Sequence, residues 1–224
     1  NLNGGTMAVT RIEKTLAAGL ATVNFNGGTL RAKANEAAFL QGIDAANVQA
    51  GGALIDTNGF AITIGQPLIG TGGLAKSGPG TLTLTGANSY AGVTSVSEGK
   101  LSITTASNAT GAISLADATT FGLTQSAVDD SYTTNAVTFG TSDVTTLDMD
   151  LGNFAGFTAN APLVVSGSGA LALNGAVTVN IADSLPAVGT VPLVSYTGGK
   201  SGAGSFVLGT LPDGVVATLD DNGT

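Results

Sequence analysis

The sequence predicts an all-β fold of stacked coils, a β-solenoid, and three observations support this prediction. Motifs of two small residues followed by Thr or Ala and an apolar residue recur at residues 4–7, 27–30, 51–54 and 168–171. The roughly two-dozen-residue period is typical of repeat architectures, in which no unit buries its apolar face alone. Hydrophobic residues make up 43% of the 224 positions but aromatic residues only 5%, and there is no Trp. The core must therefore consist of small aliphatic side chains, which suit coils stacked about 4.8 Å apart.

Residues 1–70 read as strands and turns with one exception. Between residues 35 and 48 the period of two is lost, and Asn35 can cap a short helix that carries Phe39, Leu40 and Ile43 on one side. We therefore expect one short helical excursion near 35–48. Residues 53–64 form two apolar runs around Asn58-Gly59, a strong turn dipeptide, which allows either a hairpin or a corner of a solenoid.

The regular pattern weakens between residues 104 and 160, where strands are expected at 113–115 and 136–139. It returns at 162–165, 170–173 and 176–181. Residues 186–224 carry longer apolar runs and three of the six prolines. We predict β-helix coils over 1–185 and either terminal coils or a small continuous β subdomain over 186–224.

Corners are expected where glycine and asparagine gather. Glycine has no steric penalty at positive φ, and an asparagine amide can bond the local backbone or stack on its counterpart in the next coil. The asparagines expected beside corners are Asn24, Asn26, Asn58, Asn88, Asn108 and Asn174.

The stretch from Gly73 to Ile103 carries the most specific pattern of the chain. It reads Gly-Leu-x-Lys-x-Gly, then Gly-Thr-Leu-Thr-Leu-Thr-Gly, then Asn-x-Tyr-x-Gly, and closes with a Gly-x-Leu strand. This pattern resembles the autotransporter-associated β-helix repeat of exported bacterial passenger domains. The resemblance implies a right-handed parallel β-helix at the cell surface, in which the repeat assists folding and secretion. Residues 1–5 enter in the middle of a repeat and residues 220–224 stop at an expected turn, so we expect the chain to be a segment of a longer protein.

Composition excludes several classes of function. Seven Lys and Arg face fifteen Asp and Glu, so the net charge of −8 argues against a nucleic-acid partner. The chain has no Cys and no His, which removes thiol nucleophiles, zinc sites of the usual kind and imidazole acid–base chemistry. No apolar run is long enough to cross a bilayer as a helix. We expect no cofactor, no metal and no transmembrane segment in this chain.

Three acidic pairs are candidates for chemistry. Asp148 and Asp150 lie two positions apart in an expected strand, which places both carboxylates on one face about 7 Å apart, a spacing compatible with calcium or paired-carboxylate catalysis. The other two pairs are Asp129-Asp130, in an expected loop, and Asp220-Asp221-Asn222-Gly223, which resembles part of a calcium loop. All three are better interpreted as acidic solvent faces, and the last two also lack the glutamate and the spacing of a complete calcium site.

A carbohydrate-active β-helix enzyme would need a basic residue beside such acids. None of the basic residues lies near an acidic pair in the sequence, although stacking can bring Arg31 or Lys33 beside Arg11 as a basic patch without an acid. The basic residues are Arg11, Lys14, Arg31, Lys33, Lys76, Lys100 and Lys200. The tyrosines Tyr90, Tyr132 and Tyr196 are too few for a sugar-stacking platform, and Tyr90 is expected to cover a coil edge with its hydroxyl in water. We predict no catalytic residue.

The sequence leaves three functional hypotheses. The first is a non-catalytic extracellular module of a bacterial surface protein, a structural rod or adhesin passenger. The second is a self-assembling subunit of an extracellular filament or matrix. The third is a carbohydrate-active enzyme. The expected location is the cell surface or exterior of a Gram-negative-type bacterium. The expected partners are neighbouring segments of a longer chain or copies of itself, with surface glycans or other cells as candidate ligands.

Overall fold

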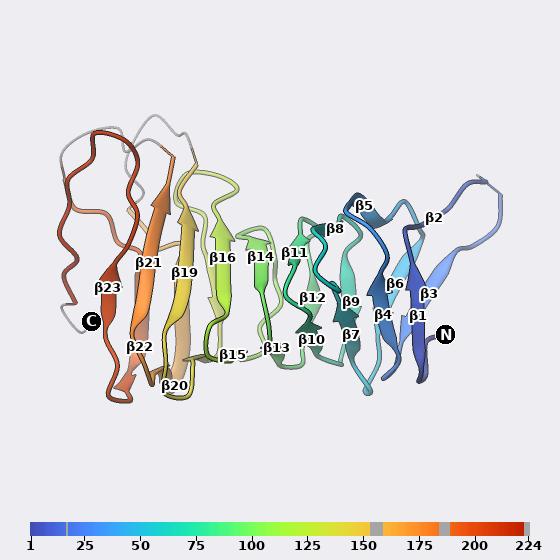
Figure 1. Ribbon diagram of the computed structural model, residues 1–224, viewed down its shortest axis with the longest axis horizontal. Helices are drawn as coiled ribbons and strands as arrows, with labels where there is room; N and C mark the ends of the chain where they lie inside the picture. The colour runs from blue at the N-terminus through green and yellow to red at the C-terminus, as the bar shows by residue number, and fades with distance from the viewer. Residues whose placement is uncertain (17, 153–158, 184–188, 222–224) are drawn as a thin grey trace.

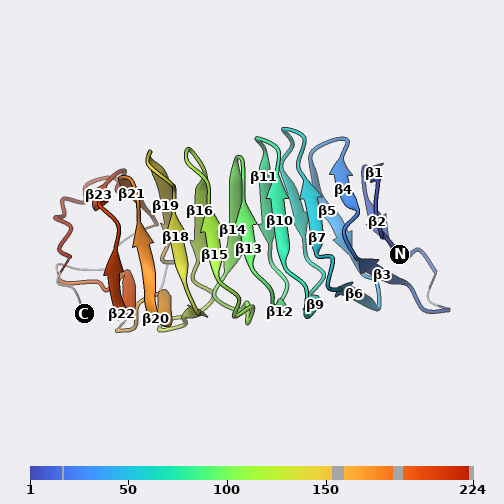
Figure 2. The same ribbon diagram turned by 90° about the horizontal axis from the view of Figure 1, so that it is seen from below.

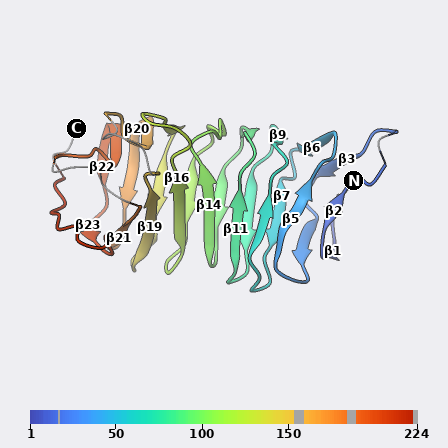
Figure 3. The same cartoon turned by 90° about the horizontal axis from the view of Figure 1, so that it is seen from above.

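A computed structural model describes residues 1–16, 18–152, 159–183 and 189–221. These residues form twenty-three strands and no helix. The strands stack side by side into an elongated body with β1 and β23 near its opposite ends (Figure 1). Two views at right angles to the first show the same row of strands along the long axis (Figures 2 and 3).

The strands belong to three sheets. The ten-stranded sheet contains, in spatial order, β1 (Thr6–Val9), β4 (Thr29–Ala32), β7 (Ala53–Asp56), β10 (Leu74–Ser77), β13 (Thr94–Val96), β15 (Ile113–Leu115), β18 (Val137–Phe139), β20 (Leu163–Leu173) and β17 (Tyr132–Thr134), with β22 (Val194–Ser201) paired to β20. The nine-stranded sheet contains β2 (Ile12–Glu13), β5 (Glu36–Gln41), β8 (Ile62–Ile64), β11 (Thr81–Leu84), β14 (Lys100–Thr104), β16 (Thr120–Thr124), β19 (Thr145–Asp150), β21 (Val177–Ala182) and β23 (Phe206–Leu208). The four-stranded sheet contains β12 (Ser89–Tyr90), β9 (Leu68–Gly70), β6 (Ala45–Val48) and β3 (Thr22–Phe25).

Except for β17 and β18, which both belong to the ten-stranded sheet, successive strands of the chain lie in different sheets, and strands that pair within a sheet come from successive coils. For example, β4, β7 and β10 are neighbours in the ten-stranded sheet, whereas β5, β8 and β11 are neighbours in the nine-stranded sheet. All of these pairs are parallel. The fold is therefore a parallel β-helix, and the predicted fold class is confirmed.

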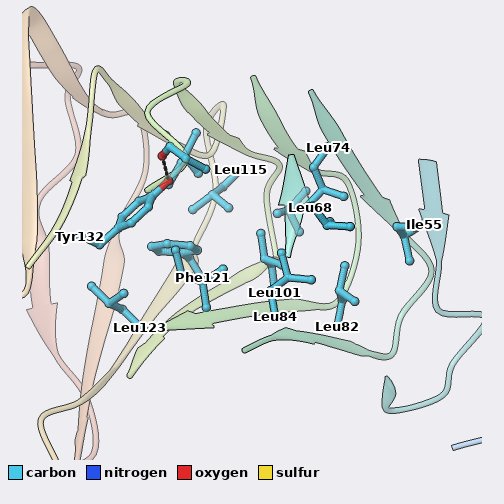
Figure 4. Close-up of a cluster of buried hydrophobic side chains, with 14 of the residues drawn as sticks. Ile55, Leu68, Leu74, Leu82, Leu84, Leu101, Leu115, Phe121, Leu123 and Tyr132 are labelled. Atoms are coloured by element: carbon cyan, nitrogen blue, oxygen red, sulfur yellow. Dashed lines mark hydrogen bonds between the residues drawn. The ribbon is translucent and has the colours of Figure 1, made fainter. Parts of the chain in front are cut away.

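The core consists of apolar columns that run along the axis. In the nine-stranded sheet, Leu82 pairs in register with Leu101, Leu101 with Phe121, and Phe121 with Leu147. All four side chains are fully buried, and three of them are seen pointing into the interior in Figure 4. Each strand alternates between a buried and a partly exposed residue, as in β19, because successive side chains of a strand point to opposite faces.

The predicted helical excursion at 35–48 is wrong. This segment forms strands β5 and β6. Phe39 and Leu40 are consecutive and both fully buried, and the pairing of β5 with β8 shifts register between Glu36 and Leu40. A β-bulge of this kind interrupts the period of two. Because the bulge puts Phe39 and Leu40 side by side in the core, the apolar spacing in the sequence resembles one side of a helix.

The Asn58-Gly59 dipeptide forms a corner, and the hairpin alternative is wrong. The strands on its two sides, β7 and β8, belong to different sheets. Asn58 and Gly59 have φ values of 50° and 85°, in the left-handed region that these two residue types tolerate best.

The small-residue motifs align the first coils to within one residue. Thr6 pairs with Thr29 as the motifs predict, but Leu30 pairs with Ile55 and not with Leu54. Consequently Ile55 is the core residue of β7, while Leu54 lies partly exposed on the outer face.

Five of the six asparagines expected beside corners lie outside the strands, whereas Asn24 lies within strand β3. Asn24 donates to the Asn1 side chain and accepts from Asn47, which makes a short asparagine ladder across three coils. The other five bond backbone groups near a corner, and these are Asn26, Asn58, Asn88, Asn108 and Asn174.

The last coils continue the same stack. One end of β20 pairs with β17 and the other with β18, so this long strand runs alongside two consecutive strands of the preceding coil. Strands β22 and β23 pair in parallel with β20 and β21. The expected boundary at 185/186 lies outside the described residues, and the proposed division of the chain stays a prediction. Among the described residues there is no helix that is long and apolar enough to cross a membrane.

Candidate functional surface

The most regular polar surface is the outer face of the nine-stranded sheet. Two columns of outward-facing residues run along it in register. The first column is Thr63, Thr83, Ser102, Gly122, Asp148 and Asn180, and the second is Thr81, Lys100, Thr120, Thr146 and Thr178. We call these two columns the polar face. Apart from Gly122, which is buried, its residues are partly exposed, and hydroxyl groups dominate it.

Lys100 and Asp148 form an ion pair that spans two coils of the polar face. The Lys100 Nζ lies 2.5 Å from the Asp148 Oδ2, although Gly122 of the intervening coil separates the two residues. A Cβ at Gly122 would lie 3.0 Å from the Lys100 Cε. Because Gly122 has no side chain, the Lys100 side chain can pass over it and reach Asp148.

Asp148 and Asp150 both point outward, on the same side of β19, while Leu147 and Met149 are buried. Asp148 also accepts a hydrogen bond from Asn180. Asp150 accepts from the Gly152 amide and lies beside Asp183, and this contact raises the pKa of the Asp183 carboxyl because the two groups share a hydrogen bond and repel as anions. The described residues contain no group of three or more acidic side chains arranged to hold a metal ion.

The other acidic pairs serve the backbone and nearby side chains. Asp129 accepts hydrogen bonds from the amides of Ala159 and Asn160, and Asp130 accepts from the Thr105 hydroxyl and the Ser131 amide. Asp221 bonds the Tyr196 hydroxyl and the Lys200 ammonium. The remaining members of that motif, Asn222 and Gly223, lie outside the described residues.

One carboxylate that the sequence did not single out accepts four hydrogen bonds. Asp117 accepts from the Thr141 hydroxyl and from the amides of Thr141, Ser142 and Asp143 in the next coil. These donors, the Thr141 hydroxyl first, hold the pKa of Asp117 well below its usual range. The contact crosses 24 positions of sequence, so only the coil register could have revealed it.

The structure brings basic residues to acids that most of them do not neighbour in the sequence. Ion pairs join Arg11 to Glu13, Lys14 to Asp44, Arg31 to Asp56, Lys100 to Asp148 and Lys200 to Asp221. Arg11 and Lys33 do line one shallow groove, as stacking suggested, but Glu13 and Glu36 line it too. Arg11 and Glu13 are two positions apart in the sequence, whereas coil stacking brings the other four pairs together, because residues one or two periods apart become neighbours.

The three tyrosines are buried and offer no stacking surface. The expected wet hydroxyl of Tyr90 is wrong, since its side chain is 3% exposed and its hydroxyl bonds the Thr94 hydroxyl at 2.8 Å. Burial raises the pKa of Tyr90 to about 12. Tyr132 donates to the carbonyl of Ala109, and burial raises its pKa as well.

The fold and this surface define a class, the elongated β-solenoid with a continuous core and a polar exterior. Residues 74–103 match the family model of the passenger-associated-transport-repeat. The chain thus carries a repeat that is typical of autotransporter passenger domains, which are secreted or exposed at the cell surface, and this confirms the resemblance. The repeat is a passenger repeat and not a catalytic family. Comparison with curated proteins and with solved structures gave no match.

Proposed function

We propose that this chain is a non-catalytic rod of a Gram-negative-type surface protein that presents its polar face to surface glycans or other cells. The observation that supports this most is the placement of the transport repeat inside an uninterrupted core. Its two main strands, β10 and β11, pair on both sides with neighbouring coils. The repeat is therefore a structural part of the rod.

The side chains of the polar face are better suited to binding a partner than to catalysing a reaction. Asp148, the carboxylate of the polar face, already accepts hydrogen bonds from both Lys100 and Asn180. The remaining positions are mostly Thr and Ser, whose hydroxyls donate and accept hydrogen bonds but have no imidazole base to activate them.

Binding of the purified protein to glycan arrays and to whole cells tests this proposal. A face variant replaces Thr120, Thr146 and Thr178 with Lys. Its matched control replaces Ser95, Ser114 and Thr138 with Lys. These three residues lie in register on the outer face of the ten-stranded sheet. The proposal expects binding that the face variant loses and the control keeps. Equal binding by both variants, or release of new reducing ends from a polysaccharide panel, would contradict it.

A second candidate, self-association of copies end to end, is favoured by the distribution of charge along the rod. Four of the seven basic residues lie before residue 34, whereas ten of the fifteen acidic residues lie after residue 100. Opposite charge at the two ends promotes head-to-tail encounter, and salt screens it within about 10 Å at 0.1 M. Light scattering over a concentration series at low and high salt should then show association that salt suppresses. A monomer at every concentration would exclude this candidate.

A further inference from the structure

Lys76 is the one lysine of the transport repeat that points into the core. Its side chain is 1% exposed, and it occupies a buried column of the ten-stranded sheet, paired with Ile55 on one side and Val96 on the other. A charged residue in such a column is unusual, because lysine is almost never fully buried without a charged partner.

The Lys76 ammonium is bound only by neutral oxygens. It donates to the Thr57 hydroxyl at 3.0 Å, to the Ser77 carbonyl at 3.1 Å and to the Gly78 carbonyl at 2.5 Å. Thr57 belongs to the corner of the preceding coil, and Ser77 and Gly78 form the corner of its own coil. These three bonds use all the donors of an ammonium group.

The surrounding charges do not contact this ammonium. Asp56, at the end of β7, is engaged by Arg31 at 2.8 Å, and the exposed Glu98 follows β13. Both act on Lys76 through space only, β11 carries no charged residue, and burial lowers the pKa of Lys76 to about 8. Taking a charge out of water without an opposite charge in contact costs several kcal/mol.

The same corner couples two successive coils. The Thr57 hydroxyl, itself fully buried, donates to the Ser77 carbonyl and accepts from the Gly80 amide. Gly78 has a φ of 76°, and a Cβ there would lie 2.5 Å from the Asp56 Oδ1. The contact between the coils at this corner is therefore close, polar and dependent on Lys76 and Thr57 together.

We propose that Lys76 makes the junction between the coils of β7 and β10 a proton-sensitive seam, where the rod opens first and opens more readily when the ammonium is charged. A solenoid is stabilised mainly by contacts between nearest neighbours. A desolvated charge at one such contact lowers the stability of that contact alone. The inference stands on the geometry of this corner and is independent of the proposed function.

Urea unfolding of the full chain between pH 7 and pH 9.5 tests the seam, with Lys76→Met and a matched control, Lys33→Met. Lys33 is exposed, and in the described part of the chain its ammonium has no hydrogen-bond or ion-pair partner. The folded pKa of Lys76 lies below its unfolded value near 10.5, so the contribution to stability grows as the pH rises from about 8. Wild type should gain roughly tenfold or more in the ratio of folded to unfolded chain over this range, relative to Lys76→Met. Wild type and Lys33→Met should change in parallel.

Parallel curves for wild type and Lys76→Met would overturn the proposal. Should Lys76→Met fail to fold, hydrogen exchange of the wild-type protein decides. The seam predicts that backbone amides at 53–58 and 74–80 open with a lower free energy than those of β16 and β19. Equal or greater protection at the seam would contradict it.

Discussion

Replacing Phe121 with Ala tests the inward register of the core. Phe121 is fully buried in β16, stacked between Leu101 and Leu147, and it points into the interior in Figure 4. Removing a buried phenylalanine costs about 3 to 5 kcal/mol, because both burial and contacts are lost. That is a large part of the roughly 5 to 15 kcal/mol that stabilises a typical domain.

The assay is urea unfolding, with Thr120→Ala as the matched control. Thr120 is the neighbour of Phe121 but faces outward, so its truncation should change the stability by less than about 0.5 kcal/mol. With a slope near 2 kcal/mol per M, the Phe121 variant should unfold at a urea concentration lower by about 1.5 to 2.5 M. A one-residue shift of register would exchange the two faces of the strand. A small effect of Phe121→Ala together with a large effect of Thr120→Ala would therefore refute the assigned register.

Three further predictions concern charge and polar contacts. Gly122→Val should separate Lys100 from Asp148. It should cost about 0.2 to 1 kcal/mol more in the wild-type background than in a Lys100→Met background, as a double-mutant cycle would measure. A coupling of zero would mean that the ion pair contributes nothing. Asp117→Asn should lose less thermal stability on acidification than wild type does. The folded pKa of Asp117 is depressed, so this carboxylate stabilises the fold above its unfolded pKa near 3.8, and that stability is lost as the pH falls below this value. An unchanged acid sensitivity would contradict the hydrogen bonding assigned to Asp117. In an ultraviolet absorbance titration of the native protein, none of the three tyrosines should ionise near pH 10, where an exposed tyrosine does. Burial raises the pKa of Tyr90 to about 12 and also raises the pKa values of Tyr132 and Tyr196. Stability from these tyrosines is complete below pH 10 and is lost above it, and a native tyrosine that titrates like the urea-unfolded chain would contradict the burial.

The sequence could predict those parts of the fold that depend on local pattern. The alternating repeat pattern at residues 80–86 agrees with the buried Leu82 and Leu84 and the partly exposed Thr81 and Thr83, and the residue types of Asn58-Gly59 are enough to predict a turn. The same reasoning failed at Phe39 and Leu40, because a bulge puts two consecutive apolar residues in the core. Local pattern cannot distinguish such a bulge from one turn of a helix.

The polar contacts could not be predicted, because they depend on how many residues each coil contains. Lys100 and Asp148 are 48 positions apart, and their contact requires both coil lengths and the glycine between them. Lys76 was visible as a motif residue, but its burial follows only from its pairing with Ile55 and Val96. When the register shifts by one residue, as between Leu30 and Ile55, aligning the coils by their sequence motifs pairs the wrong residues and such contacts are missed.

Distances between spin labels along one column of the polar face test the stacked coil architecture most directly. The chain has no cysteine, so labels can be placed pairwise at Thr63 and at Thr83, Ser102, Asp148 or Asn180, which lie one, two, four and five coils away in register. With strands about 4.8 Å apart, the backbone separation should grow in equal steps to about 24 Å at Asn180. A linear increase with coil number is the predicted result. Distances that stay constant or fail to follow coil order would contradict the β-helix and everything argued from its register.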